Sequence, residues 1–262
     1  MIERTPGFDT SEWNDNPNTV AFIDPAKAVA QGAKFAIPRI SYGLVADRIG
    51  PRAYDAYKSV GLITGAFQFC DYRTFAKYNV AAFIRHLDGR VPAFVAPDLE
   101  NNETYWPGSW PSDGSRLTYW IWDWISEFKL TGLTSKILLY TNRDTIRQMR
   151  AAPILLAKIA SEVGLWVAAY DDWEPTLAEI APWTKWSLWQ PQKKADGKLY
   201  GMESGDLDHD WWNGSLAELQ AFVGNTPAPA PNQELLALGN KIIFEGQSLI
   251  QEGQRIIEIA GK

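Results

Sequence analysis

The chain has 262 residues, 46% of them hydrophobic, with a formal net charge of −6 and a pI near 5.1. This length supports one large domain with a buried core, or a domain with an appendage, and the acidic balance argues against nucleic-acid binding and an electrostatic membrane anchor. The single cysteine, Cys70, excludes an intrachain disulfide, and no apolar run approaches the roughly 20 residues that span a bilayer.

Strand-like runs alternate with helical stretches through the first two-thirds of the chain. The first five predicted strands are Pro6–Asp9, Lys34–Tyr42, Leu62–Cys70, Pro92–Leu99 and Lys136–Thr141. The helices predicted after them lie at about residues 24–31, 52–60, 75–87, 116–129 and 143–162. Strands separated by helices of this length are typical of βα units and predict an α/β domain with a parallel sheet.

The pattern changes after the fifth unit. Three further strands are predicted at Leu165–Tyr170, Trp186–Gln190 and Met202–Asp208, followed by a helix at about residues 215–223. The segment between the last two strands is too short for a parallel crossover, and its Asp196-Gly197 pair is typical of a hairpin turn. The sequence therefore predicts five βα units closed by three strands, with at least one antiparallel pair.

A proline- and alanine-rich linker, residues 225–232, separates this domain (residues 1–224) from a C-terminal segment, residues 233–262. The linker composition predicts a stiff, extended connection. Apolar residues in the last segment repeat every seven positions, at Leu235, Leu236, Ile242, Ile243, Leu249, Ile250, Ile256 and Ile257. A strict seven-residue repeat favours a left-handed helix–helix assembly, so we expect homo-oligomers formed through this amphipathic helix.

Two alternatives to self-association exist for the C-terminal helix. A membrane-surface role is disfavoured because the polar face mixes acidic and basic residues and lacks a cationic excess. Docking back onto the first domain stays open, because the linker is long enough to reach it.

The fourth predicted strand ends in Asp98-Leu99-Glu100. Residues i and i+2 of a strand point to the same face, with Cα atoms roughly 6.6 Å apart at about 3.3 Å per residue. Two carboxylates on one face suit acid/base chemistry on a glycosidic bond, although this spacing lies between the retaining and inverting ranges. An isolated pair of this kind is more often a strand that ends in two solvated acids, so the rest of the chain decides.

Eight fragments, taken in chain order, resemble the family 25 glycoside hydrolases, the muramidases of bacteria and their phages. Between about Gly7 and Gly214 these fragments read GFDTSEW, PRISYG, GAFQF, PDLE, ILLYT, LWVAAY, WSLWQ and GDLDHDWWNG. The resemblance implies a TIM-like (β/α)5β3 barrel. It also implies cleavage of the β-1,4 bond between N-acetylmuramic acid and N-acetylglucosamine in bacterial peptidoglycan. The chain departs from the family at GAFQF, where Phe67 and Gln68 stand in place of the common Tyr and His.

Carried over by position, the resemblance places catalytic acids at Asp9, Asp98, Glu100 and Asp206. Barrel enzymes keep their chemistry at the C-terminal ends of the strands. Glu100 is expected to be the general acid, its pKa kept up by neighbouring carboxylates. Asp98 would act as nucleophile or support attack by the substrate's own N-acetyl group, while Asp9 and Asp206 would orient and stabilise charge. Asp208 shares the inward face by alternation but misses the matched position, so we expect its loss to be tolerated.

Five further side chains are candidates for substrate contact at strand ends: Arg39, Tyr42, Tyr140, Tyr170 and Trp189. For each of the four aromatic residues, core packing is an equal alternative. Arg39 is expected to be buried and to need an acid partner, one of the site carboxylates. The two histidines, His86 and His209, lack ligand spacing, so we expect no metal and no cofactor.

Two rival interpretations are weighed against a muramidase. A chitinase-like glycosidase is disfavoured because the longer DxxDxDxE run is absent before Asp98, where the chain reads VPAFVAP. A non-catalytic glycan-binding or virion structural barrel would not require Glu100. The N-terminal residues MIERTPGFD lack the pattern of a signal peptide. We therefore expect either a phage enzyme that reaches the wall from the host cytoplasm, or secretion by a non-classical route.

Overall fold

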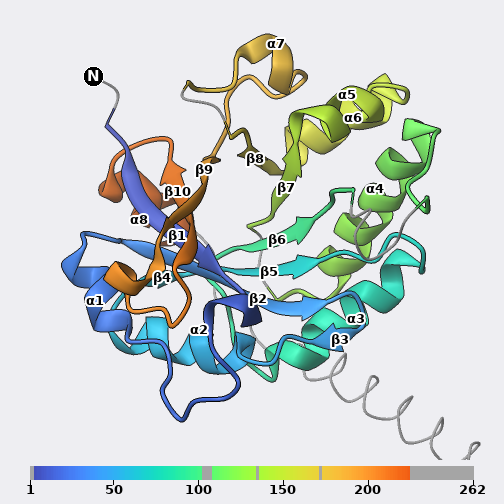
Figure 1. Cartoon of the computed structure of the whole chain (residues 1–262). Helices are drawn as coiled ribbons and strands as arrows, with labels where there is room; N and C mark the ends of the chain where they lie inside the picture. The colour runs from blue at the N-terminus through green and yellow to red at the C-terminus, as the bar shows by residue number, and fades with distance from the viewer. Residues whose placement is uncertain (1–2, 102–107, 134–135, 171–172, 225–262) are drawn as a thin grey trace, which may run out of the picture. The chain divides into compact units, whose positions relative to one another are not determined.

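The computed structural model describes residues 3–101, 108–133, 136–170 and 173–224, and the predicted linker and C-terminal helix lie outside these described residues. In the described part, eight strands close into a barrel, and helices lie on its outside (Figure 1). No helix in these ranges is long and apolar enough to cross a membrane.

The barrel strands follow the order of the predicted ones. They are β1 (Thr5–Thr10), β2 (Phe35–Tyr42), β5 (Ala66–Phe69), β6 (Val95–Asp98), β7 (Leu138–Asn142), β8 (Gly164–Ala168), β9 (Leu188–Asp196) and β10 (Asp206–Trp212). Two short strands, β3 (Val45–Ala46) and β4 (Ile63–Thr64), pair with β2.

The helices mostly separate these strands. They are α1 (Pro25–Ala30), α2 (Gly50–Ser59), α3 (Ala76–Leu87), α4 (Gly114–Leu130), α5 (Arg143–Met149), α6 (Pro153–Glu162), α7 (Leu177–Ile180) and α8 (Leu216–Gly224). Two short 3-10 helices, η1 (Glu12–Asn14) and η2 (Gly197–Tyr200), lie in loops.

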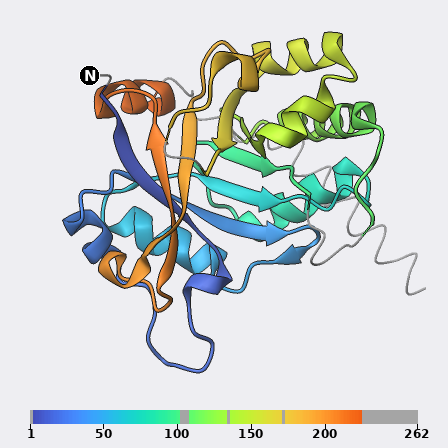
Figure 2. The same cartoon turned by 45° about the horizontal axis from the view of Figure 1, so that its top comes forward.

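The strand order around the barrel is β1, β10, β9, β8, β7, β6, β5, β2, and β2 pairs with β1 to close it. Neighbouring barrel strands are parallel except where β10 pairs with β1 and β9. The first and last strands therefore lie side by side, blue next to orange in Figure 2. The predicted α/β barrel of five βα units and three closing strands is confirmed.

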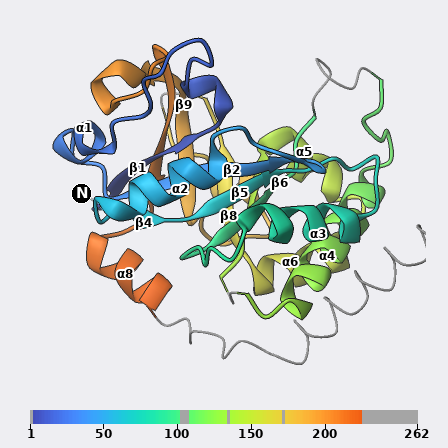
Figure 3. The same cartoon turned by 90° about the horizontal axis from the view of Figure 1, so that it is seen from below.

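Alternation along the strands divides the core into an inside and an outside. Phe35, Ile37 and Trp166 pack within the barrel. Outside it, the rings of Trp124 and Phe128 on α4 stack at 5.1 Å in a cluster formed with α3 and with α6. Figure 3 shows α2 and α3 lying across the outer side of the strands. The barrel is thus filled by side chains at its base, which leaves the strand ends to form a site.

Two predicted elements are interrupted in the structure. The third predicted strand splits into β4 and β5 at Gly65, where the backbone passes so close to the ring of Phe94 that a Cβ would lie 2.6 Å from it. The predicted helix at 143–162 splits into α5 and α6, and Pro153 begins the second because proline lacks the N–H that helix continuation needs.

The last strand begins four residues later than predicted, at Asp206 instead of Met202. The expected hairpin turn at Asp196-Gly197 is a 3-10 helix, in which the side chain of Asp196 accepts a hydrogen bond from the backbone N–H of Lys198 at 3.0 Å. This helix takes up residues that a two-residue turn would have left to the strand. The shift changes which acids of β10 reach the strand ends of the barrel.

Candidate active site

A pocket of about 220 Å³ lies at the strand ends and carries four carboxylates, from Asp9, Asp98, Glu100 and Asp208. The other residues that line it are Ser11, Trp13, Arg39, Tyr42, Phe67, Phe69, Tyr140, Trp166, Tyr170 and Gln190. We call it the acid pocket. Asp98 ends β6 and Glu100 follows two residues later, while Leu99 between them packs in the outer core. The two acids therefore share one face, as strand alternation predicts.

Burial is the main cause that raises the pKa of both acids. Burial raises the pKa of Asp98 well above its usual value, and the charge of Glu100 adds to this effect while Arg39 opposes it. Burial, and then the charge of Asp208, raise the pKa of Glu100 from 4.5 to about 7. An acid with such a pKa still holds its proton in a large share of molecules at neutral pH, as a proton donor must.

The acids of β1 and β10 form a second group. Burial, and then the charges of Asp208 and Asp210, raise the pKa of Asp9. Asp210 does not line the pocket; it is 1% exposed and accepts a hydrogen bond from the indole N–H of Trp166 at 2.7 Å. Burial raises its pKa as well. Because these groups crowd one another, they cannot all carry charge at once.

Arg39 lines the same pocket, but its guanidinium is bound by two acids that do not line it. Its Nε donates to Asp47 Oδ2 at 2.7 Å, and its Nη2 donates to Glu12 Oε1 at 3.2 Å. Asp47 in turn accepts the backbone N–H groups of Ile49 and Gly50 at 3.0 and 3.1 Å. The expected ion pair between Arg39 and a site carboxylate is therefore wrong. The charge of Arg39 nevertheless lowers the pKa of Asp98.

The acid that β10 contributes is Asp208, not Asp206. Asp208 pairs with Asp9 across the β1–β10 register and lines the pocket, whereas Asp206 is exposed and pairs with Asp196 of β9. Asp206, Asp208 and Asp210 lie two positions apart along the strand, so alternation alone does not choose among them. The register of β10 with β1, which puts Asp208 opposite Asp9, decides among them. The expected place of Asp206 in the site, and of Asp208 outside it, is corrected accordingly.

Trp189 also lies outside the acid pocket. Its ring belongs to the outer core, and its indole N–H donates to the carbonyl of Ala169 at 3.1 Å. Its neighbour Gln190 faces inward and lines the pocket in its place. Strand alternation is the signal that separates the two, because adjacent residues of β9 must point to opposite sides. Tyr42, Tyr140 and Tyr170 line the pocket as expected.

The departure from the family at Phe67 and Gln68 affects the pocket through one residue. Phe67 lines it and meets Trp166 edge to face at 5.9 Å. Gln68 points the other way and is fully buried, donating to Ser41 Oγ at 3.0 Å and accepting from the indole N–H of Trp124 at 2.8 Å. Gln68 therefore supports the barrel wall and does not touch the pocket.

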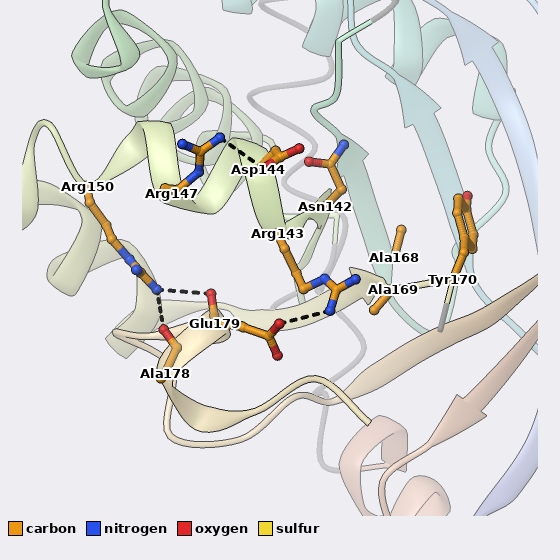
Figure 4. A pocket seen from close by; sticks show the side chains of 10 residues that line it. All are labelled: Asn142, Arg143, Asp144, Arg147, Arg150, Ala168, Ala169, Tyr170, Ala178 and Glu179. Carbon is orange, nitrogen blue, oxygen red and sulfur yellow. Dashed lines mark hydrogen bonds and ion pairs between the residues drawn. The ribbon is translucent and has the colours of Figure 1, made fainter. Parts of the chain in front are cut away.

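A second pocket of about 750 Å³ lies beside the first and shares Tyr170 with it (Figure 4). Three of its residues are arginines, and we call it the arginine pocket. Arg143 donates to Glu179 Oε1 at 2.9 Å, and Arg147 donates to Asp144 Oδ1 at 3.0 Å. Arg150 donates to the backbone carbonyls of Ala178 and Glu179. Each guanidinium is thus engaged by groups of α5 or α7. In neither pocket, nor elsewhere in the described residues, do three His, Cys, Asp or Glu side chains cluster as metal ligands.

Comparisons with known proteins agree with this architecture. The family model of glycosyl hydrolases family 25 matches residues 8–197. Lysozyme M1 of Streptomyces globisporus is 25% identical over 231 residues, which are 84% of this chain and 71% of that protein.

Solved structures of similar fold include two that cover most of both chains. A muramidase from Acremonium alcalophilum superposes with a TM-score of 0.65 at 26% identity, over 84% of this chain and 98% of that one. The bacterial lysozyme from Streptomyces coelicolor superposes with a TM-score of 0.68 at 23% identity, over 84% of this chain and 97% of that one.

Proposed function

Because the chain belongs to the glycosyl hydrolases family 25, we propose that it is a lysozyme that hydrolyses bacterial peptidoglycan. The bond cleaved is the β-1,4 bond between N-acetylmuramic acid and N-acetylglucosamine. The similar proteins named lysozyme and muramidase support this substrate, and the acid pocket supports the reaction. The observation that carries the proposal is the meeting of Asp98 and Glu100 with Asp9 and Asp208 in one pocket at the strand ends, and the raised pKa of Glu100, about 7, agrees with it.

Glu100 acts as the general acid. Glycosidic oxygens leave poorly as alkoxides, so a carboxylic acid beside the bond must supply a proton. The acid pocket keeps that proton on Glu100 at neutral pH by burial and by the charge of Asp208. The same proton could not be held by an exposed glutamate, whose pKa lies near 4.3.

The other acids of the pocket serve the positive charge that develops on the sugar ring. Asp98 lies on the same face as Glu100, and it acts either as nucleophile or by supporting attack from the substrate's N-acetyl group. Among the described residues, its Oδ1 is buried and has no hydrogen-bond partner, so this oxygen keeps its full capacity to accept a hydrogen bond. Asp9 and Asp208 orient and stabilise charge from the opposite wall, which is formed by β1 and β10.

The test is product analysis on purified peptidoglycan. After digestion, borohydride reduction converts the new reducing ends to sugar alcohols. A muramidase yields muramitol, a glucosaminidase yields glucosaminitol, and a non-catalytic barrel yields neither. Chito-oligosaccharides assayed in parallel detect a chitinase-like activity. Glucosaminitol alone, or no new reducing ends, would overturn the proposal.

Two further expectations rest on the sequence and lie outside the described residues. We propose that the heptad helix at residues 233–262 joins two or more chains, so that several barrels act on one wall. Light scattering after size exclusion on the full chain and on a truncation that ends at Asn225 tests this. A monomeric full-length chain at micromolar concentration would contradict it. The place of action proposed is the bacterial cell wall, reached from the host cytoplasm or by a non-classical route.

A further inference from the structure

One buried amide connects three side chains of the acid pocket. Gln190 on β9 is 2% exposed, and its Nε2 donates to Asp9 Oδ2 at 2.6 Å. Its Oε1 accepts two hydrogen bonds, from the hydroxyl of Tyr140 at 2.9 Å and from the hydroxyl of Tyr170 at 2.8 Å. All four residues line the pocket. Gln190 therefore joins groups contributed by β1, β7 and the end of β8 at a single point.

The direction of these bonds decides what the two tyrosines can offer a substrate. A phenol has one hydrogen, and an amide oxygen can only accept. Both phenol hydrogens are therefore used on Gln190. Burial raises the pKa of Tyr140 and of Tyr170, so neither phenol loses its hydrogen near neutral pH. Toward the pocket, both oxygens have lone pairs only.

The orientation of the amide is set by Asp9. In the reverse orientation the amide oxygen would lie 2.6 Å from Asp9 Oδ2, and two acceptors at this distance repel. The raised pKa of Asp9 does not remove this repulsion, because Asp9 also forms a hydrogen bond with Asp210, and a proton shared between these two carboxyl groups leaves Oδ2 as an acceptor. The reverse orientation would also free both phenol hydrogens to donate into the pocket. The two orientations thus predict opposite hydrogen-bonding preferences for the substrate.

We propose that Gln190 is a positioning residue that makes Tyr140 and Tyr170 a pair of acceptors, and that this pair recognises the N–H of a substrate acetamido group. Sugar hydroxyls both donate and accept, so an acceptor pair does not select among them. The acetamido N–H can only donate. This group distinguishes N-acetylated amino sugars from other hexoses, and the inference rests on the proposed function because peptidoglycan carries the group on every sugar.

A structural role for Gln190 alone would give a different outcome. A buried amide with every bond satisfied contributes to stability, and its loss would then weaken folding without changing ligand preference. The discriminating measurement is therefore a ratio of affinities for two ligands, which a loss of stability does not move.

The test uses the full chain carrying Glu100→Gln, which is expected to bind without cleaving. Ligand one is the disaccharide of N-acetylglucosamine and N-acetylmuramic acid, and ligand two carries O-acetyl in place of each N-acetyl. Calorimetry gives the two dissociation constants. In ligand two an ester oxygen replaces the acetamido N–H, so the hydrogen bond to the two tyrosines is lost. Ligand two should therefore bind roughly 5-fold to 150-fold more weakly than ligand one.

Variants then assign this discrimination to the amide. In Gln190→Met the phenols can turn and donate, so the ratio should fall to within about 2-fold. Gln190→Glu still accepts from both tyrosines and should keep the ratio, although it repels Asp9. Tyr170→Phe, at a half-exposed position, should reduce the ratio and does not depend on refolding of the core. Thermal unfolding of each variant checks the fold.

The inference is overturned if both ligands bind equally to the Glu100→Gln chain, or if Gln190→Met keeps the full ratio. Equal binding together with muramitol release by the wild-type chain would reject the acceptor pair and leave the proposed function standing. Absence of muramitol would reject the proposed function itself.

Discussion

The two pockets are neighbours that share Tyr170, yet they hold their acids in opposite ways. In the arginine pocket, Glu179 accepts from the backbone N–H and hydroxyl of Thr176 and from Arg143. These hydrogen bonds, the one from the Thr176 backbone first, lower its pKa. In the acid pocket, Glu100 is partly buried next to the charge of Asp208, and its pKa rises to about 7.

The difference separates an acid that stabilises structure from an acid that can move a proton. A carboxylate with donors on every side keeps its charge and gains little from protonation. A carboxyl group that is buried beside other acids is costly to ionise, and its folded environment favours the neutral form. In the proposed function, the proton on Glu100 depends on this cost of ionisation, and Glu179 in the arginine pocket does not bear it.

The largest effect that tests this difference is on the rate. Glu100→Gln should lower peptidoglycan hydrolysis by about 10²–10⁴-fold, because an amide cannot donate the proton that the leaving oxygen needs. Loss of cell-wall turbidity measures the rate, and circular dichroism checks the fold. A near-normal rate in a folded variant would remove Glu100 from the mechanism.

The same substitution should raise stability at alkaline pH. The pKa of Glu100 is raised in the fold from 4.5 to about 7, so its favourable contribution is present below pH 4.5 and is lost as pH rises through 7. This shift corresponds to roughly 3 kcal/mol at about 1.36 kcal/mol per pKa unit.

Urea unfolding of the wild type and Glu100→Gln should therefore give similar free energies at pH 4. At pH 8 the variant should be more stable by up to roughly 3 kcal/mol. A variant that is less stable than the wild type at pH 8 would show that burial does not penalise the charge of Glu100.

The acids of β10 provide a matched pair within one strand. Asp208→Asn should lower the rate by about 10-fold to 100-fold, because it removes a charge that raises the pKa of Glu100 and that faces Asp9. Asp206→Asn, outside the pocket, should change the rate by less than about 3-fold. Equal losses in both variants would show that the strand does not carry its functional acid at Asp208.

The sequence predicts some of these features and misses others. The alternation of strands and helices of defined length predicts the barrel, and the two-residue period places Asp98 and Glu100 on one face. Those signals are local. The depth of Asp208 in the barrel depends on the pairing of β10 with β1, which are about 200 residues apart in sequence, and on a 3-10 helix that the Asp196-Gly197 pair does not reveal.

The partners of pocket residues are the other part that local patterns miss. Arg39 forms its ion pair with Asp47, which directly follows β3. No rule of sequence spacing predicts that an arginine in β2 pairs with this acid. Gln190 stands beside the more conspicuous Trp189, and its role appears only when the strand's inward face is known. Side-chain networks of this kind are set by tertiary contacts, so their residues are the last to be predicted.

The smallest expected effect is on the stability of a variant in the arginine pocket. Its dependence on pH should be opposite to that of Glu100→Gln. Glu179→Gln should destabilise the fold by about 1 kcal/mol or less at pH 7, because the ion pair with Arg143 is partly exposed and screened.

The pKa of Glu179 is lowered in the fold, so its contribution to stability is present above its unfolded pKa and is lost as pH falls through the folded pKa. At acid pH, both Glu179→Gln and Glu100→Gln should therefore have nearly the free energy of unfolding of the wild type. As pH rises, Glu179→Gln should become less stable than the wild type and Glu100→Gln more stable. Asp144→Asn is the control, since the Arg147–Asp144 pair is 71% and 78% exposed and should contribute almost nothing. Divergence in the same direction would mean that the two pockets do not differ in how they hold an acid.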